Sequence, residues 1–432
     1  MAGGRGREAG RGSACRETAH GLRGVPAGTA LIAPARSAAY EVIRRVFEHE
    51  AYADRAFAAA AAGLDERDRA LAQRLAYGTV QRVRLLDHAI ETLGKRPVRK
   101  LDAPVLAALR LGAYQLAYAE GVPRYAAVNE SVELVRRARL ERAVPFTNAV
   151  MRRVADGIEG LLAALPEGPL KHSYPDWVYE TWRDELGEEA ALALMRAQNE
   201  PPEAVVRVVS GEIDGEPTDV PGAVRVDHID DAAFAEGRIW PQSRASQLAG
   251  LAVGAREGER ILDSCAAPGG KATMLAGEVF AVEIHEARAR ELEENVRRLG
   301  ATNVRVVNAD ATDLPPELDG FDRALVDAPC SGLGVLNRRP DLRWRATPLP
   351  ELQLALVNAA AERVKPGGVL VYAVCTMSRA ENEEIVDAAG LEPDPTLADE
   401  WPQYRHPHRP EFLLTLPHLH NTNGFFIARL RA

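Results

Sequence analysis

Two cysteines of this chain lie at or just beyond the expected carboxyl ends of strands. Cys330 lies in the segment Asp327-Ala328-Pro329-Cys330-Ser331-Gly332, and Cys375 closes the apolar run Val369–Val374. The chain holds only four cysteines in 432 residues, so two thiols in such positions suggest chemistry. A thiolate can attack an electrophilic carbon. If both thiols face one pocket, one can attack while the other serves a second step.

From Trp240 onward the sequence has the pattern of strands that alternate with helices. This alternation predicts a doubly wound, mostly parallel sheet, in which ligands bind beyond the carboxyl ends of the strands. We expect helices at 287–299 and 349–364 and strands at 260–264, 279–284, 304–308, 323–327, 369–374 and 425–430.

Carboxylates and a loop of small residues follow these strands. The first strand runs into Cys265-Ala266-Ala267-Pro268-Gly269-Gly270-Lys271, where the backbone can approach a ligand closely. The next three strands lead to Glu283, Asp310 and Asp327. Three acidic strand ends beside a glycine-containing turn predict a cofactor that contains a nucleoside.

The loop itself narrows the choice of cofactor. It has neither the Gly-x-Gly-x-x-Gly fingerprint of dinucleotide sites nor the Gly-x-x-x-x-Gly-Lys-Ser/Thr pattern of triphosphate sites. S-adenosylmethionine is therefore the best candidate, with Glu283 on its ribose and Asp310 on its adenine edge. With that methyl donor, a thiolate that adds to carbon 6 of cytosine would make carbon 5 nucleophilic, and Asp327 could bind the pyrimidine edge.

The front half of the chain has a different character. Apolar residues recur at helical spacing from about residue 35 to residue 165, which predicts an all-α domain of five or six helices. Residues 1–33 carry a net charge of +3, residues 34–165 carry +5 and the remainder carries −17. The asymmetry fits either ordinary variation between domains or an RNA-binding module joined to an acidic catalytic body. The basic clusters are Lys95–Lys100, Arg136–Arg139 and Arg152–Arg153.

We therefore expect four regions: a disordered tail at 1–33, an all-α domain at 34–165, a connecting α/β subdomain at 166–235 and a Rossmann-like domain at 236–432. Within the connecting subdomain we expect one helix at 177–197 and strands at 204–209 and 223–226. The composition predicts a cytoplasmic monomer without disulfides, metal or membrane segment, since no cysteine or histidine cluster has zinc spacing and no apolar run is long enough to span a bilayer.

The motifs in this order resemble the Fmu/Sun (RsmB-type) RNA 5-methylcytosine methyltransferases. The resemblance rests on Asp327–Gly332, Ala266–Lys271 and Ala373-Val374-Cys375-Thr376, and it extends to Ala245–Leu248, Arg339–Trp344 and Glu381-Asn382-Glu383. Phe146-Thr147-Asn148-Ala149-Val150-Met151-Arg152 resembles the NusB-like RNA-binding module of that subfamily. The resemblance covers nearly everything from residue 34 onward.

The resemblance implies a role for each site residue. Cys375 is the nucleophile, Cys330 assists breakdown of the covalent adduct, and Asp327 and Lys271 support the base. The cofactor site is lined by Cys265, Ala266, Ala267, Pro268, Gly269, Gly270, Lys271, Glu283, Asp310 and Asp327. The NusB-like front end implies small-subunit (16S) ribosomal RNA or its precursor as substrate, with an unpaired or extruded cytidine.

Other features leave alternatives open. Only eight residues separate Gly270 from Val279, so we expect about two helical turns where the family has a longer helix. The same chemistry on transfer RNA, or a non-catalytic RNA-binding assembly factor, remains an alternative function. Arg338, Arg339 and Arg343 fit RNA contact and a solvated surface equally well. Cys265 reads as a packed residue beside the cofactor loop.

Overall fold

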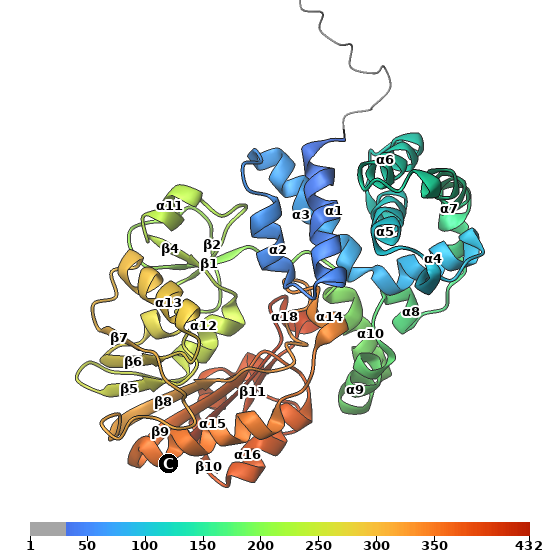
Figure 1. The fold of residues 1–432 in the computed structure, drawn as a ribbon. Coiled ribbons are helices and arrows are strands. Elements are labelled where there is room, and N and C mark those ends of the chain that lie inside the picture. Colours follow the sequence, from blue (N-terminus) through green and yellow to red (C-terminus); the bar gives the residue numbers. More distant parts are fainter. Residues whose placement is uncertain (1–31) are drawn as a thin grey trace, which may run out of the picture.

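A computed structural model describes residues 32–432 of the chain (Figure 1). The tail expected at residues 1–33 lies almost entirely outside the described residues. No helix from residue 32 onward combines the length and the apolar character needed to cross a membrane. Among these residues, no group of three or more His, Cys, Asp and Glu side chains is arranged to hold a metal ion.

The front part is a helical bundle with its own hydrophobic core. It contains seven α-helices where five or six were expected: α1 (Pro34–Glu48), α2 (Ala53–Ala60), α3 (Glu66–Gln81), α4 (Val83–Gly94), α5 (Ala103–Tyr118), α6 (Arg124–Arg137) and α7 (Val144–Ala164). Two 3-10 helices, η1 (Val98–Lys100) and η2 (Glu141–Ala143), join them. The expected number was therefore too low. Arg82 alone separates α3 from α4.

The middle of the chain forms three helices and a small antiparallel sheet. The single helix expected at 177–197 is two helices, α9 (Asp176–Leu186) and α10 (Glu188–Ala197), because Gly187 between them adopts a positive φ of 87°. The other elements are α8 (Pro169–His172), β1 (Val205–Val208), β2 (Glu216–Pro217), β3 (Ala223–Arg225), α11 (Asp231–Ala235) and β4 (Ile239–Pro241). The sheet order is β2-β3-β1-β4, so both expected strands form.

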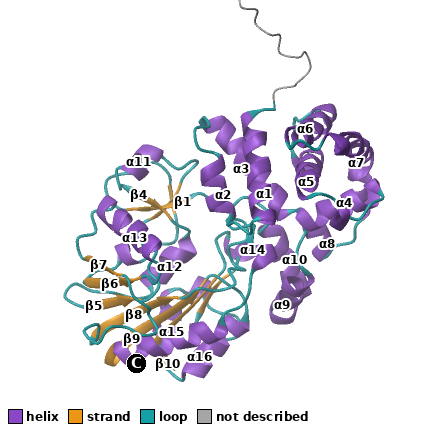
Figure 2. Cartoon of the chain, in the orientation of Figure 1, coloured by secondary structure: helices purple, strands orange, loops and turns teal. Residues whose placement is uncertain are grey.

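The rest of the chain is the expected doubly wound domain (Figure 2). Its strands are β5 (Arg260–Asp263), β6 (Glu278–Val282), β7 (Val304–Val307), β8 (Phe321–Asp327), β9 (Val364–Val374), β10 (Glu392–Pro393), β11 (Leu413–Thr415) and β12 (Phe425–Arg431). The order is β10-β12-β9-β8-β5-β6-β7, with β11 on β12, and the five strands from β9 to β7 are parallel. The strand order reverses between β5 and β8, which is where such sheets bind ligands.

Helices cover both faces of this sheet, and alternate residues of its strands enter two separate cores. Leu370, Tyr372 and Val374 of β9 pack on one side with residues of α15, while Val371 and Ala373 pack on the other side with residues of α12. The helices are α12 (Arg244–Leu251), α13 (Glu286–Arg298), α14 (Leu342–Arg345), α15 (Pro350–Arg363), α16 (Glu383–Ala389), α17 (Thr396–Glu400) and α18 (Pro417–His420), with 3-10 helices η3 (Ala272–Met274), η4 (Arg379–Glu381) and η5 (Pro402–Tyr404).

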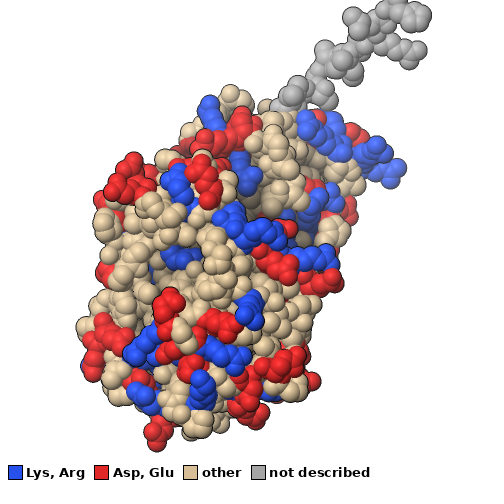
Figure 3. Space-filling view, turned by 90° about the vertical axis from the view of Figure 1, so that its left-hand side faces the viewer, with Lys and Arg blue, Asp and Glu red and all other residues tan. Residues whose placement is uncertain are grey.

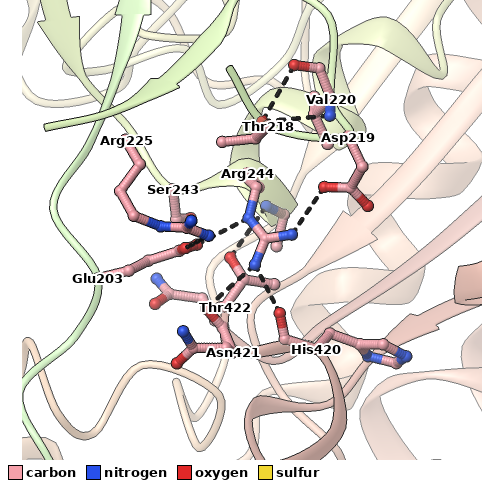
Figure 4. Close-up of polar contacts among 12 residues, drawn as sticks. Glu203, Thr218, Asp219, Val220, Arg225, Ser243, Arg244, His420, Asn421 and Thr422 are labelled. Atoms are coloured by element: carbon pink, nitrogen blue, oxygen red, sulfur yellow. Dashed lines mark hydrogen bonds and ion pairs between the residues drawn. The ribbon is translucent and has the colours of Figure 1, made fainter. Parts of the chain in front are cut away.

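Arg244, at the start of α12, fastens the small sheet to the large domain (Figure 4). Its guanidinium pairs with Glu203 at 3.0 Å, just before β1, and with Asp219 at 2.7 Å, between β2 and β3. It also donates to the carbonyl oxygens of His420, the last residue of α18, and of Asn421, which follows it. One buried side chain therefore holds three segments that lie far apart in the sequence.

Arg343 in α14 performs the same task between the helical bundle and the sheet domain. Its buried guanidinium donates to the carbonyl oxygen of Gln81 at 2.9 Å, to that of Ser173 at 3.2 Å and to the hydroxyl of Tyr174 at 2.7 Å. The guanidinium also lies 3.6 Å from the centre of the Tyr174 ring. The RNA contact considered for Arg343 is therefore wrong, because the side chain is enclosed by protein.

The neighbours of Arg343 strengthen the same junction. Trp344 donates its indole N–H to the carbonyl oxygen of Val80 at 2.6 Å, and Arg339 lies 3.6 Å from Asp54. Arg338 is largely enclosed and donates to the carbonyl oxygen of Glu203 at 2.8 Å. The segment Arg339–Trp344 is thus a docking element within the chain. The domain boundaries placed at residues 165 and 235 stay a prediction.

We predict that Arg343→Met weakens this junction. The substitution leaves several buried carbonyl groups without a donor, so the free energy of unfolding should fall by about 3 kcal/mol. Differential scanning calorimetry should show the transition shifted down or split in two. Arg297→Met provides the control, because Arg297 is an exposed residue of α13 and its substitution should shift the transition far less. Equal shifts in the two variants would contradict this role.

Candidate functional site

The carboxyl ends of four neighbouring strands enclose a cavity of about 490 Å³. Its lining includes five of the expected cofactor residues: Cys265 after β5, Ala267 in the loop that follows, Glu283 after β6, Asp310 after β7 and Asp327 at the end of β8. The cavity lies at the point where the strand order reverses. A site of this kind takes a small ligand that bridges several strand ends.

Glu283 and Asp310, two acidic residues in the lining of the cavity, differ in their exposure to solvent. Glu283 is buried, and one of its carboxylate oxygens accepts the backbone N–H of His285 at 2.9 Å. Asp310 is exposed, and the hydroxyl and N–H of Thr312 both donate to one of its oxygens, which lowers the pKa of Asp310. Each carboxylate keeps an oxygen for a ligand, as the hydroxyls and amino group of a nucleoside require.

The glycines of the loop are required by close contacts on both sides. Gly269 has a φ of 107°, and a Cβ there would lie 2.7 Å from Leu292 of α13. A Cβ on Gly270 would lie 2.4 Å from Nε1 of Trp240 in β4. The loop carbonyls of Ala267 and Pro268 are held by Arg288 and Asn295 of α13, at 3.1 and 2.9 Å. The backbone is therefore fixed in the shape that borders the cavity, and this shape fits the expected cofactor.

The helix after the loop is shorter than the two turns expected. Only the three residues Ala272–Met274 form a 3-10 turn before β6 begins at Glu278. Ala266 is buried in the core and, like Pro268, Gly269 and Gly270, shapes the loop without lining the cavity.

Lys271 points away from solvent toward the end of β8. Its ammonium group lies 2.6 Å from Oδ2 of Asp327 and 5.2 Å from the centre of the Phe425 ring in β12. The pairing of Lys271 with Asp327, which the sequence placed in one site, is present. Phe425 was not predicted as a site residue, since an apolar residue that opens a strand carries no local signal of a ligand.

The two thiols lie together beside this ion pair. Cys330 and Cys375 approach to 3.4 Å between their Sγ atoms, because β8 and β9 are parallel neighbours with Asp327 opposite Ala373. The hydrogen bond to Cys375, together with burial, raises the pKa of Cys330 well above its ordinary value. The raised pKa favours the protonated form of Cys330, and either sulfur of the pair can be the donor.

The surroundings of the third cysteine of the region, Cys265, disfavour its thiolate form. Burial raises the pKa of Cys265, and the nearby charges of Asp263 and Asp327 raise it further. A thiol that stays protonated is a poor nucleophile. Cys265 accordingly contributes surface to the cavity, as its sequence position beside the loop indicates.

Four further residues belong to the site although the sequence did not single them out. Ile284 and Leu352 are exposed apolar side chains that line the cavity and can cover a flat ring. Arg288 lies 3.6 Å from Glu283. Burial, and then the charge of Asp327, raises the pKa of Asp263 to about 7. Only Asp263 carried a local signal, as an acidic residue at the end of an apolar strand.

A buried carboxylate, Glu381 in η4, holds the loops of both thiols. It accepts hydrogen bonds from the backbone N–H and the hydroxyl of Ser331, the residue after Cys330. It also accepts the N–H of Leu349 at 3.1 Å and the side-chain amide of Gln353 at 2.9 Å. The Ser331 hydroxyl in turn lies 2.9 Å from that of Thr376, the residue after Cys375. Glu381 thereby fixes the relative position of the two thiols.

We predict that Glu381→Gln lowers the free energy of unfolding by about 3 kcal/mol, because an amide cannot accept all four of these donors. Chemical denaturation of the purified protein measures this change. Glu384→Gln is the control, since Glu384 is exposed in the neighbouring helix α16. Equal stability of the parent protein and Glu381→Gln would contradict the role of Glu381.

Comparison with known proteins agrees with this geometry. Residues 251–431 match the family model "16S rRNA methyltransferase RsmB/F", and residues 33–156 match the NusB family. A probable ribosomal RNA small subunit methyltransferase B from Bacillus subtilis is 33% identical over 411 residues, which cover 85% of this chain and 91% of that protein.

Two solved structures share the fold. The crystal structure of PH0851 has a TM-score of 0.76 and 23% identity, and it covers 94% of this chain and 100% of its own. The structure of NSun6 from Pyrococcus horikoshii with SFG, an analogue of S-adenosylmethionine, has a TM-score of 0.52 and 24% identity, with coverage of 60% and 98%. With a NusB-family front end and a second half that matches the methyltransferase model, the chain belongs to the RsmB/F family of ribosomal RNA methyltransferases.

Proposed function

We propose that this protein forms 5-methylcytosine in 16S ribosomal RNA through a covalent bond between Cys375 and carbon 6 of the target cytosine. The observation that carries the proposal is the pair of thiols 3.4 Å apart beside the cofactor cavity. Bound S-adenosylmethionine supplies an electrophilic methyl group. Carbon 5 of cytosine is a poor nucleophile, and addition of a thiolate at carbon 6 activates it.

The ion pair of Lys271 and Asp327 is suited to hold the base. Asp327 can accept a hydrogen bond from the exocyclic amino group of cytosine. Lys271 can donate a hydrogen bond to the ring nitrogen or the carbonyl oxygen of the base. The positive charge of Lys271 would stabilise the electron-rich ring that forms when Cys375 adds. Both groups are half-buried or better, so water competes weakly for these contacts.

The hydrogen bond between the thiols suggests how their work is divided. In the resting pair Cys330 holds the proton and Cys375 accepts it, which favours attack by Cys375. Once the sulfur of Cys375 is bonded to carbon 6, the largest cause of the raised Cys330 pKa is removed. After carbon 5 has received the methyl group, Cys330 can give its own proton to water and take the proton from carbon 5, and the bond from Cys375 to carbon 6 then breaks with the Cys375 thiolate restored.

We predict that Cys375→Ala abolishes methylation and that Cys330→Ala lets the covalent protein–RNA adduct accumulate, because addition then outruns release. A denaturing gel with labelled 16S ribosomal RNA detects the adduct, and bisulfite sequencing of the RNA treated with the parent protein identifies the modified cytidine. The double variant Cys330→Ala/Cys375→Ala is the control and should form no adduct.

Each alternative function predicts a different result in these assays. Modification of transfer RNA in place of 16S ribosomal RNA would support the transfer-RNA substrate. Binding of RNA without any conversion of cytidine would support the non-catalytic assembly factor. Absence of an adduct with Cys330→Ala, while the parent protein is active, would overturn the division of work between the thiols.

A basic patch on the helical bundle is suited to hold the RNA. Lys95, Arg96, Arg99 and Lys100 lie between α4 and α5, and all four are exposed. Arg153 of α7 joins them through a hydrogen bond to the carbonyl oxygen of Gly94, at 3.4 Å. Within residues 32–432 none of these five side chains forms an ion pair with a carboxylate, so their charges are free for phosphates.

Two other surfaces are less suited to RNA. In the cluster Arg136–Arg139, Arg136 is paired with Glu133, which neutralises part of its charge. Over the lower half of the face shown in Figure 3, acidic and basic side chains are intermixed. A phosphate backbone needs a continuous positive surface, and on this comparison the basic patch is the better candidate.

We predict that the triple variant Lys95→Gln, Arg99→Gln, Lys100→Gln weakens RNA binding and reduces its dependence on salt. Each lost phosphate contact should lower the slope of log affinity against log salt by about 0.7 to 0.9. Filter binding at several salt concentrations gives this slope. Arg290→Gln is the control, because Arg290 is already paired with Glu286. An unchanged slope in the triple variant would exclude the basic patch.

A further inference from the structure

The small sheet of the connecting subdomain touches the cofactor loop through a buried arginine. Arg207 in β1 is only 8% exposed. Its guanidinium donates to the hydroxyl of Thr273 at 2.7 Å and to the carbonyl oxygen of Thr273 at 3.2 Å. Thr273 lies in η3, the single turn that follows the loop. A strand 66 residues earlier in the chain thus reaches the segment that borders the cofactor cavity.

The contact passes on to the loop itself. The Thr273 hydroxyl donates to the carbonyl oxygen of Gly269 at 2.7 Å, and the Thr273 N–H donates to the same oxygen at 3.0 Å. Arg207 therefore acts on the loop through Thr273. The positions of Gly269 and of the residues beside it depend on where Thr273 is held.

Trp240 gives the sheet a second contact with the loop. Arg207 and Trp240 lie opposite each other in the antiparallel pair β1–β4, so their side chains project from the same face of the small sheet. The indole lies so close to Gly270 that a Cβ there would come within 2.4 Å of Nε1. One face of the sheet thus supports two adjacent parts of the loop and its turn.

Burying the charged guanidinium of Arg207 without an ion-pair partner costs free energy. Among residues 32–432 no carboxylate forms an ion pair with Arg207, and its Nε–H has no acceptor. Burial lowers the pKa of Arg207 to about 10, so the side chain remains a cation at neutral pH. Burying an unpaired charge is unfavourable unless hydrogen bonds compensate for the lost water. The bonds to Thr273 are those that this structure provides.

The short turn after the loop explains why such support is needed. In this chain three residues of 3-10 helix lead from Lys271 to the bend before β6, so few helical hydrogen bonds hold the end of the loop. We propose that Arg207, with Trp240 beside it, is a positioning residue of the S-adenosylmethionine site, which holds loop 265–271 in its cofactor-binding shape from the connecting subdomain. The small sheet is thereby a part of the cofactor site.

Calorimetric titration of the purified full-length protein with S-adenosylmethionine tests the proposal. Arg207→Met keeps the aliphatic stem and removes the donors, and it should weaken cofactor binding by roughly tenfold, or about 1.4 kcal/mol. Thr273→Val should weaken it similarly. Because both changes interrupt one connection, the double variant should bind no more weakly than the weaker single variant. The KM for S-adenosylmethionine should rise by the same factor, while the KM for RNA and kcat at saturating cofactor stay unchanged.

Arg225→Met is the matched control. Arg225 lies in β3 of the same sheet and pairs with Glu203 and Glu216, away from the loop, so this variant should keep the parent affinity. Three results would overturn the proposal: parent affinity in Arg207→Met, additive losses in the double variant, or an equal loss in Arg225→Met. Thr273→Val keeps the test decisive if Arg207→Met does not fold. The titration uses no RNA, so its outcome is independent of the proposed cysteine chemistry.

Discussion

The parallel pairing of β8 with β9 is the constraint on which the whole site depends. It aligns Asp327 with Ala373, and the chain then needs only three residues to reach Cys330 and two to reach Cys375. Two thiols from segments 45 residues apart thereby meet at 3.4 Å. Slipping this register by one residue would turn every side chain to the opposite face. The closeness of the two thiols therefore follows from the register of the sheet.

Electrostatics then makes two chemically identical groups different. Cys330 is followed by Ser331, whose N–H and hydroxyl are taken by the buried carboxylate of Glu381, so a negative charge stands behind this loop. That charge contributes to the raised pKa of Cys330, after the hydrogen bond to Cys375 and burial. On the other side of the site the ammonium group of Lys271 offers positive charge where an electron-rich ring would form. The two thiols therefore have different electrostatic surroundings.

The sequence was sufficient for the parts of this site that local patterns encode. Alternating apolar runs located the strands. Because strand ends in a parallel sheet meet at one edge, the sequence alone places Glu283, Asp310, Asp327 and both thiols close together. Contacts between distant segments had no such pattern. Arg207 reaches Thr273 and Arg343 reaches Gln81 across 66 and 262 residues, and an arginine in a strand or short helix looks the same whether solvent or protein surrounds it. The helix break at Gly187 was missed because the apolar periodicity continues through it.

The enclosed guanidinium of Arg343 has a consequence for how the molecule can select a substrate. From α14 of the sheet domain it bonds at once to the bundle and to the segment before α9, so the basic patch and the two thiols belong to one framework. The separation between them is then a fixed length of the protein. We expect such a framework to select RNA by distance. A cytidine is modified when it lies at this distance from the phosphates that the basic patch binds, and an accessible cytidine at another distance is not modified.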